Sequence, residues 1–178
     1  MTSGMRTMTA LAVSGLAIAG LTAASNGAAV AGERTEQDQQ VPACQGADLS
    51  VGKGETQAGM HQRGMDIVVT NTAWQACSID GYPTVTLLDA DHNPVRTNDE
   101  YGSTYFKQDP GARRIVLEPG ENVASNLAYT HPTAPDEPQV TASHLRIHTP
   151  GATEGEFVIP IYRTQVYRSE VTATALAR

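Results

Sequence analysis

The chain has 178 residues, of which 40% are hydrophobic, and 12 Lys and Arg stand against 19 Asp and Glu for a formal net charge of −7. Nucleic acids and anionic membranes bind clusters of Lys and Arg, so this acidic balance argues against both classes of partner.

The first predicted element is an export signal over residues 1–31. Arg6 is the only charge before Glu33, and apolar and small residues fill the stretch from 7 to 21. A membrane span needs about 20 strongly apolar residues, whereas this stretch is short, contains glycine and precedes Ala29-Val30-Ala31, a small-x-small cleavage pattern. We expect cleavage after Ala31 and a secreted product without a membrane span in the mature chain. A retained N-terminal anchor is the alternative.

A polar leader, one domain and a short tail are expected after the signal. Residues 32–42 contain almost nothing to bury, which predicts a disordered leader. Residues 43–168 are expected to form a single domain, because the length left after the signal is close to the commonest domain size. Residues 169–178 are assigned to a C-terminal tail.

Cys44 and Cys77 are the only cysteines. In an exported chain an even cysteine count predicts a disulfide, and closing this loop removes roughly 3 to 4 kcal/mol of entropy from the unfolded state. Two free thiols acting as nucleophile or ligand are the alternative, but reactive thiols need basic neighbours and no histidine lies close to either in sequence.

Short runs of alternating apolar residues follow from residue 65 onward. An alternation with a period of two is typical of half-buried strands, and about seven to nine strands with no helix are expected. The clearest runs are residues 65–70, 84–88, 115–117, 123–129, 145–148 and 157–161.

Turn residues separate these runs. Pro110-Gly111, Pro119-Gly120 and Pro150-Gly151 suit type II turns, in which Pro presets the second position and Gly accepts the positive φ of the third. Short strands spaced by such turns predict an antiparallel immunoglobulin-like β-sandwich. A barrel is the alternative.

One acidic run follows the ligand spacing of a calcium loop: Asp89, Asp91, Asn93 and Glu100. Pro94 stands where that loop needs Gly, and the preceding segment is a predicted strand rather than a helix. We interpret the run as the tip of a β-hairpin, with an irregular calcium site as the alternative.

No other constellation predicts catalysis or metal binding. His144 and His148 would stand about 13 Å apart along a strand, too far to share an ion, while His61, His92 and His131 fall in predicted loops. A serine hydrolase needs Gly-x-Ser-x-Gly, which the chain lacks. We therefore predict no catalytic residue, no cofactor and no enzyme activity.

Four aromatic residues are the candidates for a binding surface. Tyr101, Tyr105 and Phe106 crowd a loop that contains glycine, and Trp74 lies in a turn beside Cys77. Tyr and Trp bind by stacking and through a polar edge. The alternative is packing, with Trp74 covering the disulfide and one of the other three closing the end of the core.

The order of these motifs resembles the domain-of-unknown-function 4232 family. The resemblance rests on Cys44, on Asn71-Thr72, on Cys77-x-Ile79-x-Gly81-Tyr82-Pro83 and on Leu117-x-Pro119-Gly120, and covers about residues 43–162. It implies an all-β secreted or envelope domain, exported from actinobacteria, without an established activity. Similar members often carry a further cysteine between residues 130 and 139, which this chain lacks.

The favoured hypothesis is a non-enzymatic secreted or envelope domain that binds an extracellular protein or glycan, because a sandwich presents loops and edge strands on a rigid frame. The alternative is a small secreted enzyme or protease inhibitor. An inhibitor would present an exposed, rigid loop held by the disulfide, and an enzyme a deep pocket with a shifted acid or histidine. No residue pattern specifies the ligand or the oligomeric state.

Overall fold

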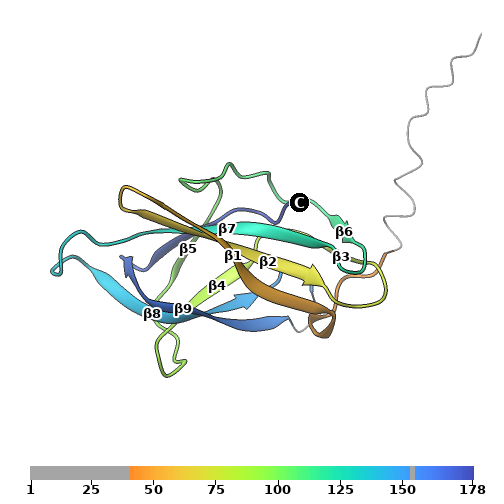
Figure 1. Cartoon of the computed structure of the whole chain (residues 1–178), viewed down its shortest axis with the longest axis horizontal. Helices are drawn as coiled ribbons and strands as arrows, with labels where there is room; N and C mark the ends of the chain where they lie inside the picture. Colours follow the sequence, from red (N-terminus) through yellow and green to blue (C-terminus); the bar gives the residue numbers. More distant parts are fainter. Residues whose placement is uncertain (1–40, 153–154) are drawn as a thin grey trace, which may run out of the picture. The chain divides into compact units, whose positions relative to one another are not determined.

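The computed structural model describes residues 41–152 and 155–178 of the chain. The predicted signal peptide, its cleavage site and the leader up to residue 40 lie outside the described residues. Within them the chain forms one short 3-10 turn, η1 (Gly46–Asp48), and ten strands, with no α-helix (Figure 1). The strands are β1 (Leu49–Gly59), β2 (Gln62–Asn71), β3 (Cys77–Ile79), β4 (Thr84–Leu88), β5 (Asn98–Tyr101), β6 (Ile115–Leu117), β7 (Asn122–Thr130), β8 (Gln139–His148), β9 (Glu156–Tyr167) and β10 (Glu170–Ala173).

Three sheets make up the domain. One has five strands in the order β1-β2-β7-β10-β5, one has three in the order β4-β8-β9, and β3 pairs with β6. Neighbouring strands are antiparallel except β10 and β5, which run parallel. Figure 1 shows β1, β2 and β7 in one layer and β4, β8 and β9 in the other. This confirms the predicted all-β antiparallel sandwich.

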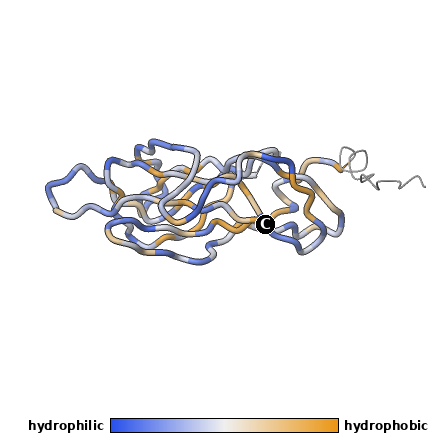
Figure 2. The backbone as a smooth tube through the Cα atoms, turned by 90° about the horizontal axis from the view of Figure 1, so that it is seen from above, coloured by the Kyte–Doolittle hydropathy of each residue, from blue (hydrophilic) through white to orange (hydrophobic). Residues whose placement is uncertain are grey.

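The main core lies between the five-stranded and the three-stranded sheet. Met65 and Ile67 of β2 and Leu145 and Ile147 of β8 are buried at every second position, as their alternation predicts. In Figure 2 hydrophobic stretches follow the strands and hydrophilic stretches mark the loops. A fully buried Leu or Ile stabilises the fold by about 1.5 to 3 kcal/mol, so a slip of one residue, which would expose all of them, is strongly disfavoured.

A second core surrounds the disulfide. Cys44 and Cys77, 33 positions apart in the sequence, are bonded at an S–S distance of 2.00 Å, which confirms the predicted pairing. Val69, Leu117 and Leu176 pack in the same cluster. The bridge therefore joins the start of the domain to β3 at a point where the end of the chain also packs.

The domain extends beyond both predicted boundaries. Pro42, assigned to the leader, accepts a 2.8 Å hydrogen bond at its carbonyl oxygen from the backbone N–H of Ser78. The prediction of a tail over residues 169–178 is wrong, because β10 pairs with β7 and β5 within the five-stranded sheet and Ala177 bridges Ala124 of β7. The apolar residues of this segment are mostly alanines, which are weak strand formers, so its alternation is faint in the sequence.

The strand count exceeds the seven to nine expected because β1, β5 and β10 carry weak patterns. β1 contains three glycines and a register shift after Lys53, and most residues of β5 are exposed. Gly111, Gly120 and Gly151 have the expected positive φ, 73°, 83° and 71°, and the chain turns at Pro119-Gly120 and Pro150-Gly151, whereas Pro110-Gly111 lies in an irregular segment without a turn.

Candidate binding surface

A segment after β5 covers the outer face of the five-stranded sheet. We call residues 102–110 the strap. Its side chains contact β1, β2 and β7. Figure 1 shows this green stretch on the far side of β7 from β4, β8 and β9, which is the face opposite the main core. Three of the four predicted aromatic residues lie on the strap or directly before it.

A buried polar network fixes the strap to the sheet. The Asp66 side chain is only 10% exposed; its carboxylate lies 2.8 Å from the Lys107 ammonium and accepts a 2.8 Å hydrogen bond from the Asn126 amide. Thr104 donates its hydroxyl proton to Asn126 Oδ1 over 2.6 Å. A buried charge is tolerated only when it is paired and hydrogen-bonded, and here the strap supplies the countercharge. Nothing in the local sequence identifies this network, since the three side-chain bonds that connect the strap, β2 and β7 join residues 22 to 60 positions apart.

Glycines in β1 and β2 leave room for the strap's aromatic rings. A Cβ atom at Gly64 would lie 2.6 Å from Cδ2 of Phe106, and one at Gly59 would lie 3.1 Å from Cε1 of Tyr105. The two rings meet edge to face at 5.1 Å. Phe106 is partly buried and therefore packs, as the alternative interpretation allows, whereas Tyr105 is 61% exposed.

Asp109 closes the base of the strap. One carboxylate oxygen accepts a 2.6 Å hydrogen bond from the Tyr82 hydroxyl, and the other accepts one of 2.8 Å from the backbone N–H of Ala175. The bond with Tyr82 lowers the pKa of Asp109 and raises the pKa of Tyr82. The Tyr82 ring lies 5.2 Å from that of Tyr101, which is 48% exposed. Tyr82 and Asp109 are thus site residues that the sequence reasoning missed.

Trp74 belongs to a separate patch on the loop 72–76 between β2 and β3. The buried amide of Asn71 organises this loop: it donates 2.8 Å and 2.9 Å hydrogen bonds to the carbonyl oxygens of Gln75 and Leu117, and its own oxygen accepts one of 2.9 Å from Ala73. Trp74 is 83% exposed, so it does not cover the disulfide.

The four predicted aromatic residues therefore form two patches rather than one. Phe106 packs on Gly64 near the start of β2, and Trp74 follows the end of that strand. At about 3.3 Å per residue, β2 separates the two patches by more than roughly 20 Å.

The candidate calcium ligands do not converge. Asp89 uses its carboxylate in a turn, where it accepts 2.9 Å hydrogen bonds from the N–H groups of Asp91 and Asn93, and the bond with Asn93 is the main cause of its lowered pKa. Glu100 lies on β5. Among residues 41–152 and 155–178, no group of three or more His, Cys, Asp or Glu could hold a metal ion.

The structure pairs a histidine differently from the sequence reasoning, which considered His144 with His148. The His144 ring lies against the His92 ring, with centroids 4.0 Å apart and planes tilted by 40°, and its Nδ1 lies 3.2 Å from the Asp89 carbonyl oxygen. His148 instead lies 3.5 Å from Glu156. The contact between His92 and His144 forms because the tip of the loop after β4 lies beside β8. The two residues are far apart in the sequence, so no local pattern predicts the contact.

These features define a class: a disulfide-linked all-β sandwich domain that presents exposed aromatic side chains on two hydrogen-bonded segments. A family model described as "Domain of unknown function (DUF4232)" matches residues 44–177, and the chain belongs to this family. The match starts at the first half-cystine and includes β10. No curated protein and no solved structure matches the chain. In the described part of the chain no helix is long and apolar enough to span a membrane.

Proposed function

We propose that this domain is a non-enzymatic binding module that acts outside the cytoplasm and recognises a protein or glycan through exposed aromatic side chains. The observation that carries the proposal is Trp74, which is 83% exposed although the fold holds its loop in a fixed position. Aromatic side chains bury about 150–250 Å² each, so covering Trp74 would contribute roughly 4 to 6 kcal/mol before the entropy of association is subtracted.

Preorganisation supports this reading. A loop that is already ordered loses little conformational entropy on binding, and the loop 72–76 is tied by the amide of Asn71 and followed directly by Cys77. The strap is similarly tied by Lys107 and Asp109. Both aromatic patches are therefore presented without prior rearrangement.

An extracellular site of action rests on two supports. The pattern of residues 1–31 is that of a cleaved export signal. The Cys44–Cys77 disulfide is of the kind that forms and persists in oxidising compartments.

The test is retention of the mature domain on immobilised glycans and on a secreted-protein fraction. We expect Trp74→Ala to weaken retention by about 30-fold or more, as for a hot-spot residue. Tyr162→Ala is the matched control, because Tyr162 is equally exposed but lies on β9. If Trp74→Ala is retained as well as the unmodified domain, the Trp74 patch is not the binding surface.

One observation favours a second candidate, a protease inhibitor. Thr72, Trp74 and Gln75 are exposed on a rigid loop that ends at the disulfide, which is how an inhibitor presents its reactive bond. An inhibitor of this kind would slow a chymotrypsin-like protease that prefers aromatic residues, and Trp74→Ala would abolish the inhibition. Rapid cleavage after Trp74 without inhibition would rule this candidate out.

A further inference from the structure

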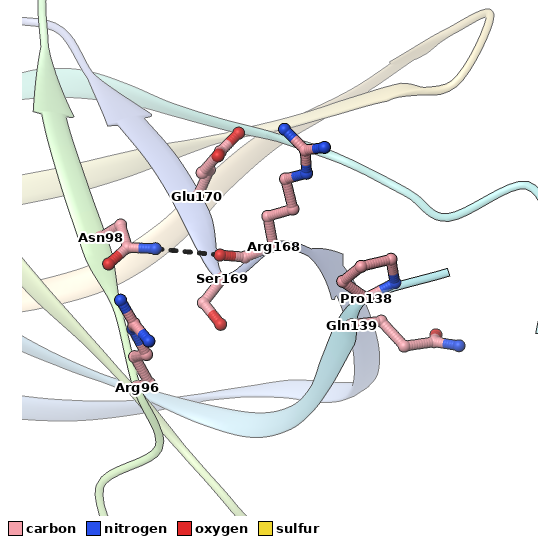
Figure 3. Close-up of a pocket in the computed structure, with 7 residues that line it drawn as sticks. All are labelled: Arg96, Asn98, Pro138, Gln139, Arg168, Ser169 and Glu170. Carbon is pink, nitrogen blue, oxygen red and sulfur yellow. Dashed lines mark hydrogen bonds between the residues drawn. The ribbon is translucent and has the colours of Figure 1, made fainter. Parts of the chain in front are cut away.

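A pocket with a volume of about 520 Å³ opens beside the turn between β9 and β10. Three segments line it: residues 96–98 before and at the start of β5, residues 138–139 at the start of β8, and residues 168–170 (Figure 3). Its volume falls in the range of small-molecule sites. None of its lining residues belongs to the strap or to the loop 72–76.

Hydrogen bonds lock the three segments together. The Asn98 amide donates to the carbonyl oxygen of Arg168 over 3.0 Å, and its backbone N–H donates to the carbonyl oxygen of Ser169 over 2.8 Å. The backbone N–H of Arg168 donates to the carbonyl oxygen of Pro138 over 2.8 Å. Hydrogen bonds to the backbone therefore fix the walls of the pocket in place.

The turn itself has an unusual backbone. Arg168 and Ser169 have φ of 51° and 61°, two successive positive values in the turn that links β9 of the three-stranded sheet to β10 of the five-stranded sheet. Two successive non-glycine residues at positive φ store strain, which structures retain mainly at functional positions. At this position the strained backbone places an arginine and a serine beside the pocket.

Three donor groups at the pocket, on Arg96, Arg168 and Ser169, have no acceptor among the described residues, and the wall also holds one buried acceptor without a donor there, Gln139 Oε1. Ser169 is 5% exposed, and its hydroxyl, which points into the pocket in Figure 3, has no hydrogen-bond partner among the described residues. Neither Arg96 nor Arg168 forms an ion pair within that same set, although the chain carries 19 acidic residues. The Arg168 guanidinium lies 5.0 Å from the centre of the Tyr167 ring, a contact that leaves its N–H donors free.

We propose that this pocket binds the oxyanion of a small ligand, a carboxylate or a phosphate, through the guanidinium group of Arg96 and the hydroxyl of Ser169, while the Arg168 guanidinium adds positive charge at the rim (Figure 3). Guanidinium N–H groups match both oxyanions in geometry, and such charge-assisted hydrogen bonds are about twice as strong as neutral ones. Glu170 on the same rim disfavours densely charged polyanions, so the site selects a single anionic group. The rest of the volume holds the uncharged part of the ligand.

The test is an NMR titration of the mature domain with inorganic phosphate and, separately, with acetate, with chloride replacing each at constant ionic strength. We expect saturable shifts of the Asn98 and Ser169 amides with at least one of the two anions. Response to phosphate alone assigns a phosphate ligand, and response to acetate alone a carboxylate. Shifts no larger than those produced by chloride overturn the proposal.

Variants separate binding from folding. Arg168→Asn removes the charge but keeps a residue that accepts positive φ, and Arg96→Ala removes the other guanidinium; each should weaken binding about tenfold with little change in thermal stability. Arg163→Ala, an exposed arginine of β9 outside the pocket, is the matched control and should bind normally. Glu170→Gln should strengthen binding. Equal affinity in Arg96→Ala, Arg168→Asn and the control would contradict the assignment.

This site is independent of the proposed aromatic recognition. Trp74→Ala should leave the anion titration unchanged, and Arg96→Ala should leave retention through the Trp74 patch unchanged. The two experiments can therefore disprove the anion pocket and the aromatic binding surface independently of each other.

Discussion

At the scale of single residues, buried polar side chains hold exposed aromatic ones in place. Asn71 is fully buried and satisfies three backbone groups, so the loop carrying Trp74 is part of the folded core rather than a free tip. Leaving such groups without partners costs about 1 to 3 kcal/mol each. The Asp66 and Asp109 carboxylates hold the strap in place in a similar way, Asp66 by pairing with the Lys107 ammonium and Asp109 by accepting a hydrogen bond from the backbone N–H of Ala175.

The hydrogen bond from the Tyr82 hydroxyl to the Asp109 carboxylate makes the stability of the folded domain depend on pH. The pKa of Asp109 in the folded state lies below the ordinary 3.8 because of the hydrogen bond from Tyr82. A lowered pKa means that the folded state favours the carboxylate, so this stabilisation is present above pH 3.8 and is lost as the pH falls through the lowered value. Asp109→Asn should therefore lose less stability than the unmodified domain between pH 5 and pH 2.

Urea unfolding across that range measures this difference. Other carboxyl groups with lowered pKa values, those of Asp89, Glu121 and Glu137, affect both proteins alike and cancel in the comparison. Parallel curves for the two proteins would show that the Tyr82–Asp109 bond does not contribute to stability.

At the scale of elements, the strap and the β1–β2 hairpin depend on each other through small residues. Gly64→Ala would place a Cβ 2.6 Å from the Phe106 ring, so we expect a loss of about 1 to 3 kcal/mol in the free energy of unfolding. Gly52→Ala is the matched control on β1, because no atom lies within 4 Å of a Cβ there. Chemical denaturation of both variants measures the difference.

A second substitution identifies the cause. If the ring of Phe106 is the main obstacle, Phe106→Ala should make Gly64→Ala much less destabilising, and the remaining cost comes from Gln57 Oε1, which would lie 2.7 Å from the same Cβ. Equal destabilisation by Gly64→Ala in both backgrounds would mean that the strap does not pack on β2 as described.

Strands with one buried face can be predicted from the sequence, whereas the packing of the strap on β2 cannot. β2, β7 and β8 have one face in the core, so their alternation is visible in the residues themselves. β10 has only four residues, with Val171 as its one large apolar side chain, and is recognisable only from its partners β7 and β5. The aromatic residues of the strap were candidates by residue type, but the separation of Trp74 from them follows from the length of β2.

At the scale of the whole molecule, the last residues complete the sandwich. β10 lies between β7 and β5, and Val171 and Ala173 belong to the main core while Leu176 packs in the cluster around the disulfide. A chain that ends at Arg168 loses all of these contacts and frees the edge of β7. We expect it to unfold or aggregate at temperatures at which the full mature chain is folded, as measured by circular dichroism and light scattering.

A chain that lacks only Arg178 is the control, because that residue is exposed and forms a surface ion pair with Glu121. It should change stability by less than about 1 kcal/mol. A fully folded chain ending at Arg168 would show that β10 is dispensable and that the boundary at residue 168 was right.

The most direct test of the binding proposal uses Trp74, the single tryptophan of the chain, as its own probe. In the free mature domain a soluble quencher should reach the exposed indole without hindrance. Once a retained protein or glycan is bound, the proposal predicts that Trp74 fluorescence shifts to shorter wavelength and becomes protected from the quencher. An indole that stays equally accessible in the saturated complex would contradict it.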